Sequence, residues 1–374
     1  MFGIFIMDSY RSLMKRNWDF RFGKFENAIK SWSPRMLETT LQRVEVVKVF
    51  ALSRIYYVAS ILPINKTMVN KIEKVIGQFI WKKAGKVLRV SIQDLKNSVD
   101  KGGLGLPCIL SRSKALMVSQ LVRLLKSGDA KSLGHVGYWL GELLSDLMPG
   151  FDDGDHAVDV PPYYDYFAHL MVEVMTSEVV SCSTWRTVTC KTIYLKFSES
   201  FPKPRIEVEA GIFYQQLWKR LSLPLHSVIS RDVLYLLVHN KLPVRERIFR
   251  IGLRVDPYCG QCPGGEICDL EHFFCSCLRV ANVWGWVRRC LVSMLGGLSA
   301  QCTNWELINL MFPDSGYEDQ CVWLVGIYVS KVWEDIFVRD RAGLDGDKFF
   351  GYLRFKYKAA QLGSRSYFGA IPGL

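Results

Sequence analysis

Apolar residues recur every three or four positions along most of this chain, which is the period of an α-helix. One apolar stripe covers residues 37–63, and a second covers residues 65–80. Ser33 and Pro34 predict where the first helix begins, because serine caps helices and proline suits the first helical position. Asn65 is placed to cap the second helix in the same way. The pattern therefore predicts a mainly α fold.

The helical period returns in the carboxyl-terminal half of the chain. Trp218 lies in a short predicted helix, and Ser230 is placed to cap the helix that follows it. Two further helices are expected to begin near Trp305 and Trp323. An acidic region separates the two helical parts. We therefore divide the chain into the regions 1–126, 127–210, 211–290 and 291–374.

Composition narrows the class of protein. A chain of 374 residues with 49% hydrophobic and 22% charged residues is long enough for two or three folded domains. The cysteine count of 11 is odd and no secretory signal is present, which indicates reduced thiols in the cytoplasm or nucleus. The apolar segments 1–7 and 321–329 are too short to span a bilayer, so we expect a soluble protein without a membrane partner.

The net charge of +12 is unevenly spread along the chain. Residues 1–126 contain 23 lysines and arginines against 8 acidic residues, whereas residues 127–200 contain 4 against 11. A local basic excess favours an anionic partner such as a nucleic-acid backbone, although a solvated helix surface has the same composition. The densest basic stretch follows Trp81. Its cations are Lys82, Lys83, Lys86 and Arg89.

A second basic cluster lies just before a group of cysteines. It contains Arg245, Arg247, Arg250 and Arg254. Arginine makes bidentate contacts with phosphate, but these side chains could equally pair with Glu246 or Asp256. We take Arg245 and Arg247, together with the four cations after Trp81, as candidate contacts to RNA or DNA.

Two short motifs do not indicate nucleotide or polymerase chemistry. Residues 101–107, with three glycines, predict a tight turn with positive φ angles and inward leucines, and they lack the pattern of a phosphate loop. Asp152 and Asp153 form a pair of the kind that holds catalytic metals, but glycines and prolines surround them where such a site needs strands. We interpret the pair as an acidic surface loop. No other residues form a nucleophile–base set, so we do not expect an enzyme.

The strongest candidate site is a set of three cysteines and one histidine. Cys259, Cys262, His272 and Cys277 follow the spacing C-x2-C-x9-H-x4-C. Structural zinc takes four such ligands in a closed tetrahedron, and three cysteines with one histidine is a common set. Gly260 permits a bend between the first two cysteines. The sequence therefore predicts one structural Zn²⁺.

Two alternatives to this ligand set stay open from the sequence alone. Cys275 could replace Cys277 as the fourth ligand, although a ligand three residues from His272 would be more strained. The cysteines could also be ordinary buried thiols, since free cysteine is among the most buried residue types.

The order of motifs around the cysteines resembles the zinc-binding region of non-LTR (LINE-type) retrotransposon reverse transcriptases. The motifs that carry this resemblance are the stretch Leu236-Leu-Val-His239-Asn240-Lys-Leu242-Pro243-Val-Arg245-Glu-Arg247, then Gly252, the cysteines, Glu271-His272 and Trp284. Further matches in the family's order are Asn17-Trp18, Trp32 with Arg35, Leu52-Ser53-Arg54-Ile-Tyr56-Tyr57, Pro63, Phe79-Ile80-Trp81 and the glycine turn at 102–107. The resemblance covers roughly residues 1–126 and 211–340.

The resemblance implies a function and the partners that go with it. In that family, the region matching 1–126 lies downstream of the polymerase palm and includes a helical thumb that grips the template–primer duplex. The chain would then be a carboxyl-terminal fragment that binds RNA or DNA, contains zinc, and lacks its own polymerase and endonuclease sites. Another protein would supply the palm. The alternative is a host-adopted or relic module whose zinc region serves protein–protein assembly.

Overall fold

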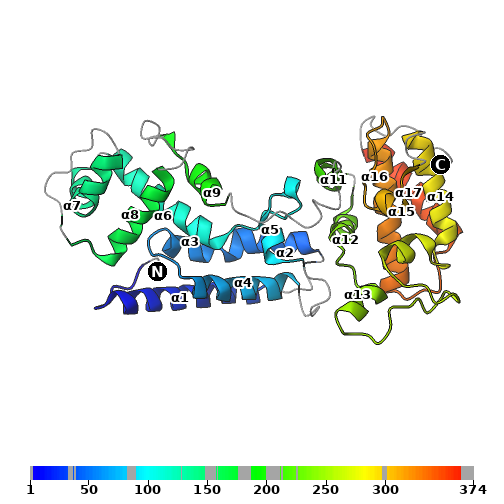
Figure 1. Ribbon diagram of the computed structural model, residues 1–374, viewed down its shortest axis with the longest axis horizontal. Coiled ribbons are helices and arrows are strands. Elements are labelled where there is room, and N and C mark those ends of the chain that lie inside the picture. Colours follow the sequence, from blue (N-terminus) through cyan, green and yellow to red (C-terminus); the bar gives the residue numbers. More distant parts are fainter. Residues whose placement is uncertain are drawn as a thin grey trace. The chain divides into compact units, whose positions relative to one another are not determined.

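The computed structural model of the protein is mainly α, as the hydrophobic pattern predicts (Figure 1). The residues that it describes are 3–32, 37, 39–81, 90–127, 129–147, 157, 159–175, 187–198, 211, 214–224, 226–296 and 301–363. Within these ranges the only β pairing is one isolated antiparallel bridge, between Tyr258 and Ile267. No helix in the described ranges is both long and apolar enough to cross a membrane.

The chain forms two compact units. Unit 1 comprises residues 1–36, 43–80 and 106–202, and unit 2 comprises residues 37–42, 81–105 and 203–374. The helices of unit 1 are α1 (Tyr10–Lys30), most of α2 (Thr40–Val46), η2 (Val47–Ala51), α3 (Ser53–Ala59), α4 (Lys66–Ile80), α6 (Ile109–Ser127), α7 (Ala130–Leu147), α8 (Pro162–Met175) and α9 (Cys190–Ser198).

Unit 2 contains the cysteine-rich region. Its helices are α5 (Ile92–Lys96), η3 (Val99–Lys101), α11 (Tyr214–Leu221), α12 (Val228–Val238), α13 (Arg245–Arg250), η6 (His272–Ser276), α14 (Ala281–Leu295), α15 (Asn304–Ile308), α16 (Glu318–Val332), η8 (Trp333–Val338) and α17 (Gly346–Gly363). Residues 81–105, which the sequence groups with the amino-terminal region, therefore belong to unit 2 by their contacts.

In unit 1, α1 packs against η2, α3 and α4. Trp18 is 3% exposed, and its indole N–H donates to the carbonyl of Pro63 at 2.8 Å. This bond ties the middle of α1 to the turn that precedes α4. The expected cap of α4 is confirmed, because the Asn65 side chain accepts from the N–H of Met68 at 2.8 Å.

The second half of unit 1 is built from α6, α7, α8 and α9. These helices share one hydrophobic core, whose fully buried members include Met117, Leu144, Met171 and Ile193. The helices α7, α8 and α9, which lie in the acidic region of the sequence, are therefore part of a packed helical body. The acidic pair Asp152–Asp153 lies outside the described residues.

The glycine turn at 102–107 has the conformation predicted from the sequence. Gly102 and Gly105 have φ angles of 78° and 63°, and Leu104 and Leu106 are buried. The carbonyl of Gly102 accepts hydrogen bonds from the hydroxyl of Tyr235 and from Nε2 of His239. A Cβ at Gly103 would lie 1.8 Å from the backbone oxygen of Asn97, so only glycine fits there.

Two sequence predictions about helix starts have a different outcome. The cap of α12 is Ser227 and not Ser230, because the Ser227 side chain accepts from the N–H of Ser230 at 3.0 Å. The prediction was three residues late, since both positions carry serine. The helix start predicted at Ser33 and Pro34 lies outside the described residues.

Candidate metal centre

The first two cysteines of the candidate site lie on a short hairpin. The N–H of Cys259 donates to the carbonyl of Glu266 at 2.8 Å, and the N–H of Cys268 donates to the carbonyl of Pro257 at 2.9 Å. Together with the bridge between Tyr258 and Ile267, these bonds close the loop that carries Cys262. A turn at Pro263–Gly265 leads away from Cys262, and Gly265 has a φ of 69°.

The histidine and the last cysteine lie on the π-helical turn η6. In an α-helix, residues five apart are separated by about 140° around the axis. In η6, the N–H of Cys277 donates to the carbonyl of His272 at 2.8 Å, which closes a wider i→i+5 turn. The Asp269 carboxylate accepts from the N–H of His272 at 2.7 Å and fixes the start of this turn. The wider turn therefore brings residues 272 and 277 to one side.

The four ligand atoms of Cys259, Cys262, His272 and Cys277 all lie within 4.8 Å of one another, and all four residues are buried. Sγ of Cys277 is 3.8 Å from Sγ of Cys259 and 3.9 Å from Sγ of Cys262. Sγ of Cys262 is 3.5 Å from Nε2 of His272. A disulfide needs about 2.05 Å, so none of these pairs is a disulfide.

These distances are those of the edges of a tetrahedron around zinc. With Zn–S bonds of about 2.3 Å and Zn–N bonds of about 2.0–2.1 Å, two sulfurs are roughly 3.8 Å apart, and a sulfur and a nitrogen roughly 3.5 Å apart. The four residues therefore fit a single metal ion, and their chemistry and spacing are compatible with one structural Zn²⁺.

The three thiols of the centre differ in pKa. Burial alone would raise the pKa of Cys259, but hydrogen bonds from the backbone of Gln261 and from His272 lower it to about 6. Burial raises the pKa of Cys277 to about 12 and also raises that of Cys262. A divalent cation would supply the positive charge that allows all three thiols to ionise together.

The spare thiols Cys268 and Cys275 lie outside this group of ligand atoms. Cys275 is 3% exposed and occupies the buried side of η6, where burial raises the pKa of its thiol. Burial likewise raises the pKa of Cys268 to about 11. The geometry thus selects Cys277 over Cys275 as the fourth ligand, a choice that the sequence left open.

Gly260 has a different role from the one expected. It has no positive φ, so the bend between the cysteines does not require glycine. Instead, a Cβ at this position would lie 2.9 Å from Nη2 of Arg245. Arg245 lies over the hairpin, donates to the carbonyl of Tyr258 at 3.1 Å and forms an ion pair with Asp256 at 3.8 Å. Gly260 therefore provides room for this arginine.

The candidate nucleic-acid contacts are not gathered in one place by the described structure. Arg247 is 8% exposed, and its guanidinium donates to the carbonyl of Asn240 at 2.8 Å. Arg245 is partly exposed, but its guanidinium already contacts the carbonyl of Tyr258 and the carboxylate of Asp256 in the hairpin. Lys82, Lys83, Lys86 and Arg89 lie outside the described residues.

The turn η6 is anchored on its other side to the core of unit 2. Phe274 is fully buried, and its carbonyl accepts from the hydroxyl of Tyr328, which is buried in α16. Two residues after Cys277, the guanidinium of Arg279 donates to the carbonyl of Ala342 at 3.1 Å, and its own carbonyl accepts from Leu344 at 2.9 Å. Hydrogen bonds of Arg279 thus connect the end of η6 to the loop that precedes α17.

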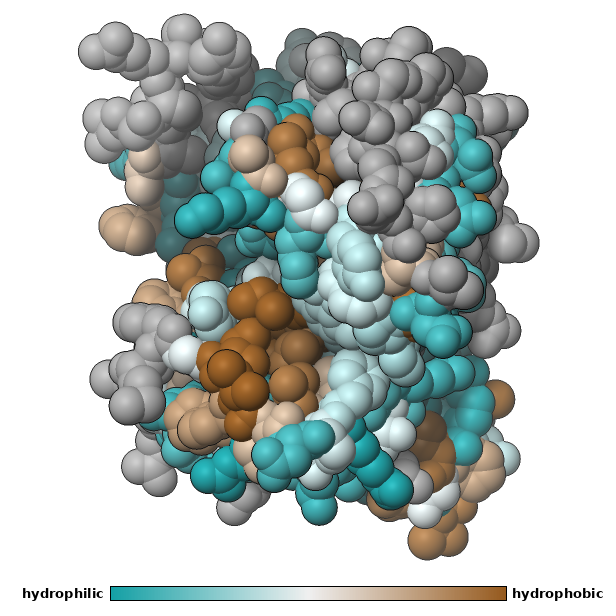
Figure 2. Space-filling view, turned by 90° about the vertical axis from the view of Figure 1, so that its left-hand side faces the viewer, coloured by the Kyte–Doolittle hydropathy of each residue, from teal (hydrophilic) through white to brown (hydrophobic). Residues whose placement is uncertain are grey.

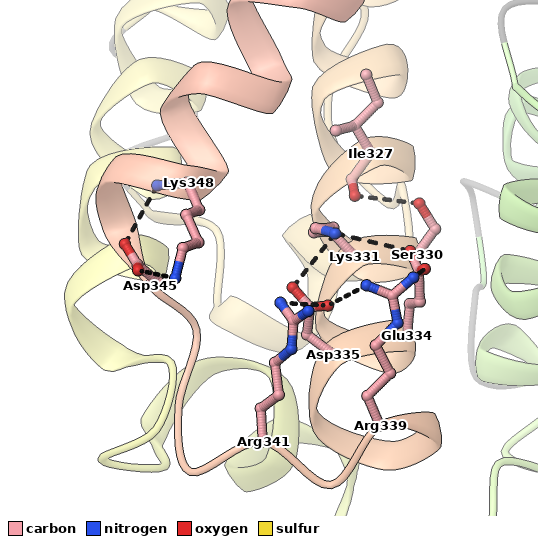
Figure 3. A network of polar contacts seen from close by, with 9 residues as sticks. All are labelled: Ile327, Ser330, Lys331, Glu334, Asp335, Arg339, Arg341, Asp345 and Lys348. Carbon is pink, nitrogen blue, oxygen red and sulfur yellow. Dashed lines mark hydrogen bonds and ion pairs between the residues drawn. The ribbon is translucent and has the colours of Figure 1, made fainter.

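That loop is fixed at its start by the ion network in Figure 3. Asp335 is 3% exposed, and its carboxylate contacts Lys331 at 3.3 Å, Arg339 at 3.4 Å and Arg341 at 3.1 Å. Glu334 pairs with the same Arg339. Arg279 was not singled out from the sequence, because no local motif marks a partner 63 residues away along the chain. Asp335 was missed for another reason: carboxylates four residues from a cation are common on solvated helix surfaces, so the spacing does not mark a buried network.

No protein-family model matches the chain, and no curated protein matches it either.

Proposed function

We propose that this chain is a carboxyl-terminal part of a non-LTR retrotransposon reverse transcriptase, which binds RNA or DNA and is stabilised by one zinc ion. In this proposal it has no polymerase or endonuclease site of its own. The single observation that carries the proposal is that the ligand atoms of Cys259, Cys262, His272 and Cys277 lie within 4.8 Å of one another, in a motif order that resembles that family.

The centre supports a structural role for the metal because it is closed. Three thiols and one imidazole complete a tetrahedron, so no position is left for a substrate or a reactive water. All four ligands are buried between a hairpin and a turn that is anchored to α16. A zinc ion held in this way contributes its binding energy to folding.

The charge distribution supports nucleic acid as the partner. Most of the basic excess lies in the first third of the chain, and much of that lies on exposed positions of α1 and α4. Among the described acidic residues, none forms an ion pair with Lys15, Arg16 or Lys24. Cations without an acidic partner are available to replace the counterions of a phosphate backbone.

The alternative function, protein–protein assembly through the zinc region, is favoured by one observation. Large apolar side chains are exposed around the centre, namely Phe249, Leu253, Val255, Tyr258, Ile267 and Leu278. Val255 is 93% exposed. A group of exposed apolar side chains on one part of a protein surface often marks a site that binds another protein.

Metal analysis combined with binding assays separates the two functions. Zinc per chain is measured on the purified protein, and binding to labelled RNA, single-stranded DNA and duplex DNA is then titrated over a salt series. The proposal predicts one zinc per chain and an affinity that falls steeply with salt. Zinc without binding, together with self-association that the double substitution V255S/L278S abolishes, would favour assembly. Absence of zinc would contradict both.

A further inference from the structure

The exposed side of α1 carries several cations. Arg11, Lys15, Arg16 and Lys24 are all exposed on this helix, and the exposed ring of Phe20 lies four residues from both Arg16 and Lys24. Residues spaced by four positions share one side of a helix, so Ser12, Arg16, Phe20 and Lys24 form one stripe. Lys15, Arg16 and Phe20, together with Ser12 and Asp19, line a hollow of about 430 Å³. Asp19 is the one carboxylate in that lining, so the hollow keeps a net positive charge.

Aromatic rings in this surface are held in place by the segment before α1. Asn17 clamps that segment, because its side chain exchanges hydrogen bonds with the N–H and carbonyl of Phe5, both at 2.9 Å. The ring of Phe5 meets the ring of Phe20 edge-on, with centroids 5.2 Å apart. Arg16 lies over Phe5, and Lys24 lies over Phe20 at 5.5 Å. Phe20 nevertheless stays 37% exposed.

Figure 2 shows the molecule from the end at which α1 begins, where hydrophilic side chains lie beside a hydrophobic patch. Cations that alternate with exposed rings are the arrangement found where proteins bind single-stranded nucleic acids. A duplex would engage the cations alone, because its bases are already stacked on one another.

We propose that the α1 face binds a single-stranded RNA or DNA segment, with Lys15 and Arg16 contacting phosphates and the ring of Phe20 stacking on a base. This inference rests on the proposed function and gives it a surface and a preferred strand form. Binding through Phe20 makes affinity depend on stacking as well as on charge, so the two contributions separate in a salt series.

The test uses the full chain with labelled twelve-nucleotide single strands of RNA and DNA and a matched duplex. Phe20→Ala is expected to weaken single-strand binding by roughly tenfold, at an unchanged salt slope and with little effect on the duplex. The double substitution K15Q/R16Q is expected to lower the salt slope for single strands by about 1.4, since each phosphate contributes about 0.7.

Matched controls come from exposed residues elsewhere. R354Q/K358Q on α17 removes the same charge from exposed positions in unit 2, and Phe249→Ala removes a similarly exposed ring from that unit. Both controls are expected to bind single strands as the wild type does. Ultraviolet crosslinking should also place bound nucleotides on the peptide that contains Phe20.

Three outcomes would overturn the inference, and they distinguish its failure from that of the proposed function. If the wild type binds with steep salt dependence but Phe20→Ala and K15Q/R16Q change nothing, the α1 face is not the surface and the proposed function stands. If Phe20→Ala weakens the duplex and the single strand equally, stacking is excluded. If the wild type binds no nucleic acid, both the proposed function and this inference are wrong.

Discussion

The metal centre of unit 2 and the basic face of α1 in unit 1 use polar side chains in opposite ways: the first buries them and the second exposes them. The centre turns four polar residues inward and buries them, so their energy stabilises the fold. The α1 face turns Lys15, Arg16 and Lys24 outward, and no acidic residue in the described part of the chain pairs with them, so they contribute little to stability and are available to a ligand. Substitutions in the first region should therefore change folding, and substitutions in the second should change binding.

The largest effect is expected from removal of the metal. His272→Ala or treatment with a strong chelator should abolish zinc binding and unfold the region of unit 2 around residues 240–290. Structural zinc contributes on the order of 10 kcal/mol to such folds, and the three remaining ligands would leave buried thiols without their cation. Hydrogen exchange of the backbone amides would measure this, with unit 1 expected to keep its protection.

Cys275→Ser is the matched control for that loss. It alters a buried cysteine three residues from His272 that is not among the ligands, so it should keep one zinc per chain. If Cys275→Ser loses the metal while Cys277→Ser retains it, the ligand set is wrong.

A smaller loss is expected from Gly103→Ala in unit 2. The added Cβ would lie 1.8 Å from the backbone oxygen of Asn97, which cannot move without opening the glycine turn. We expect a loss of about 2–4 kcal/mol in the free energy of unfolding. The control is Gly134→Ala in α7 of unit 1, where nothing lies within 4 Å; it should stabilise that unit by about 0.5–1 kcal/mol. Denaturant titration of both variants checks the contrast.

Unit 2 should also respond to acid through His239. Burial lowers the pKa of this histidine to about 4, although its hydrogen bond to Gly102 opposes the shift. The unfolded chain, with a histidine pKa of about 6.5, takes up a proton that the folded chain refuses, so stability falls as the pH drops from about 6.5 towards 4. Between pH 7 and pH 5 this amounts to about 2 kcal/mol.

The variant His239→Gln isolates the contribution of His239 to this pH dependence, because acid weakens metal binding equally in the variant and in the wild type. The difference in unfolding free energy between the two proteins should shift in favour of His239→Gln by about 2 kcal/mol on going from pH 7 to pH 5. A difference that does not change with pH would mean that His239 is not held neutral.

The smallest effect on stability is expected on the α1 face. K15Q/R16Q and Phe20→Ala should each shift the free energy of unfolding by less than about 0.5 kcal/mol, because the cations have no acidic partner to lose and the ring is partly exposed. Thermal unfolding and zinc content should match those of the wild type. A large destabilisation would mean that this face is packed against another part of the chain.

The features that the sequence predicts well are those carried by neighbouring residues. The helical period gives the mainly α fold, Asn65 gives the cap of α4, and the glycine turn at 102–107 gives its positive φ angles. The spacing of Cys259, Cys262 and His272 likewise gives most of the metal centre. Each of these depends on interactions within about fifteen residues.

The features that sequence reasoning leaves open or misses depend on how side chains fold back onto neighbouring turns. The sequence places Cys277 in the ligand set and keeps Cys275 as its alternative, and the i→i+5 bond of η6, which no periodicity in the sequence predicts, decides between them. The role of Gly260 depends on the position of Arg245, and the burial of Arg247 depends on its bond to Asn240. The i, i+4 spacing of Ser12, Arg16, Phe20 and Lys24 can be read from the sequence, but only the structure shows that these side chains are exposed.

The central claim is that Cys259, Cys262, His272 and Cys277 together bind one metal ion. The most direct measurement is the metal content of the purified chain, followed by substitution with cobalt and recording of its absorption spectrum. The account predicts one ion per chain and a tetrahedral spectrum with charge-transfer bands from three thiolates, which fall to two in Cys277→Ser and stay at three in Cys275→Ser. A chain that binds no metal, or a spectrum that is unchanged in Cys277→Ser, would contradict it.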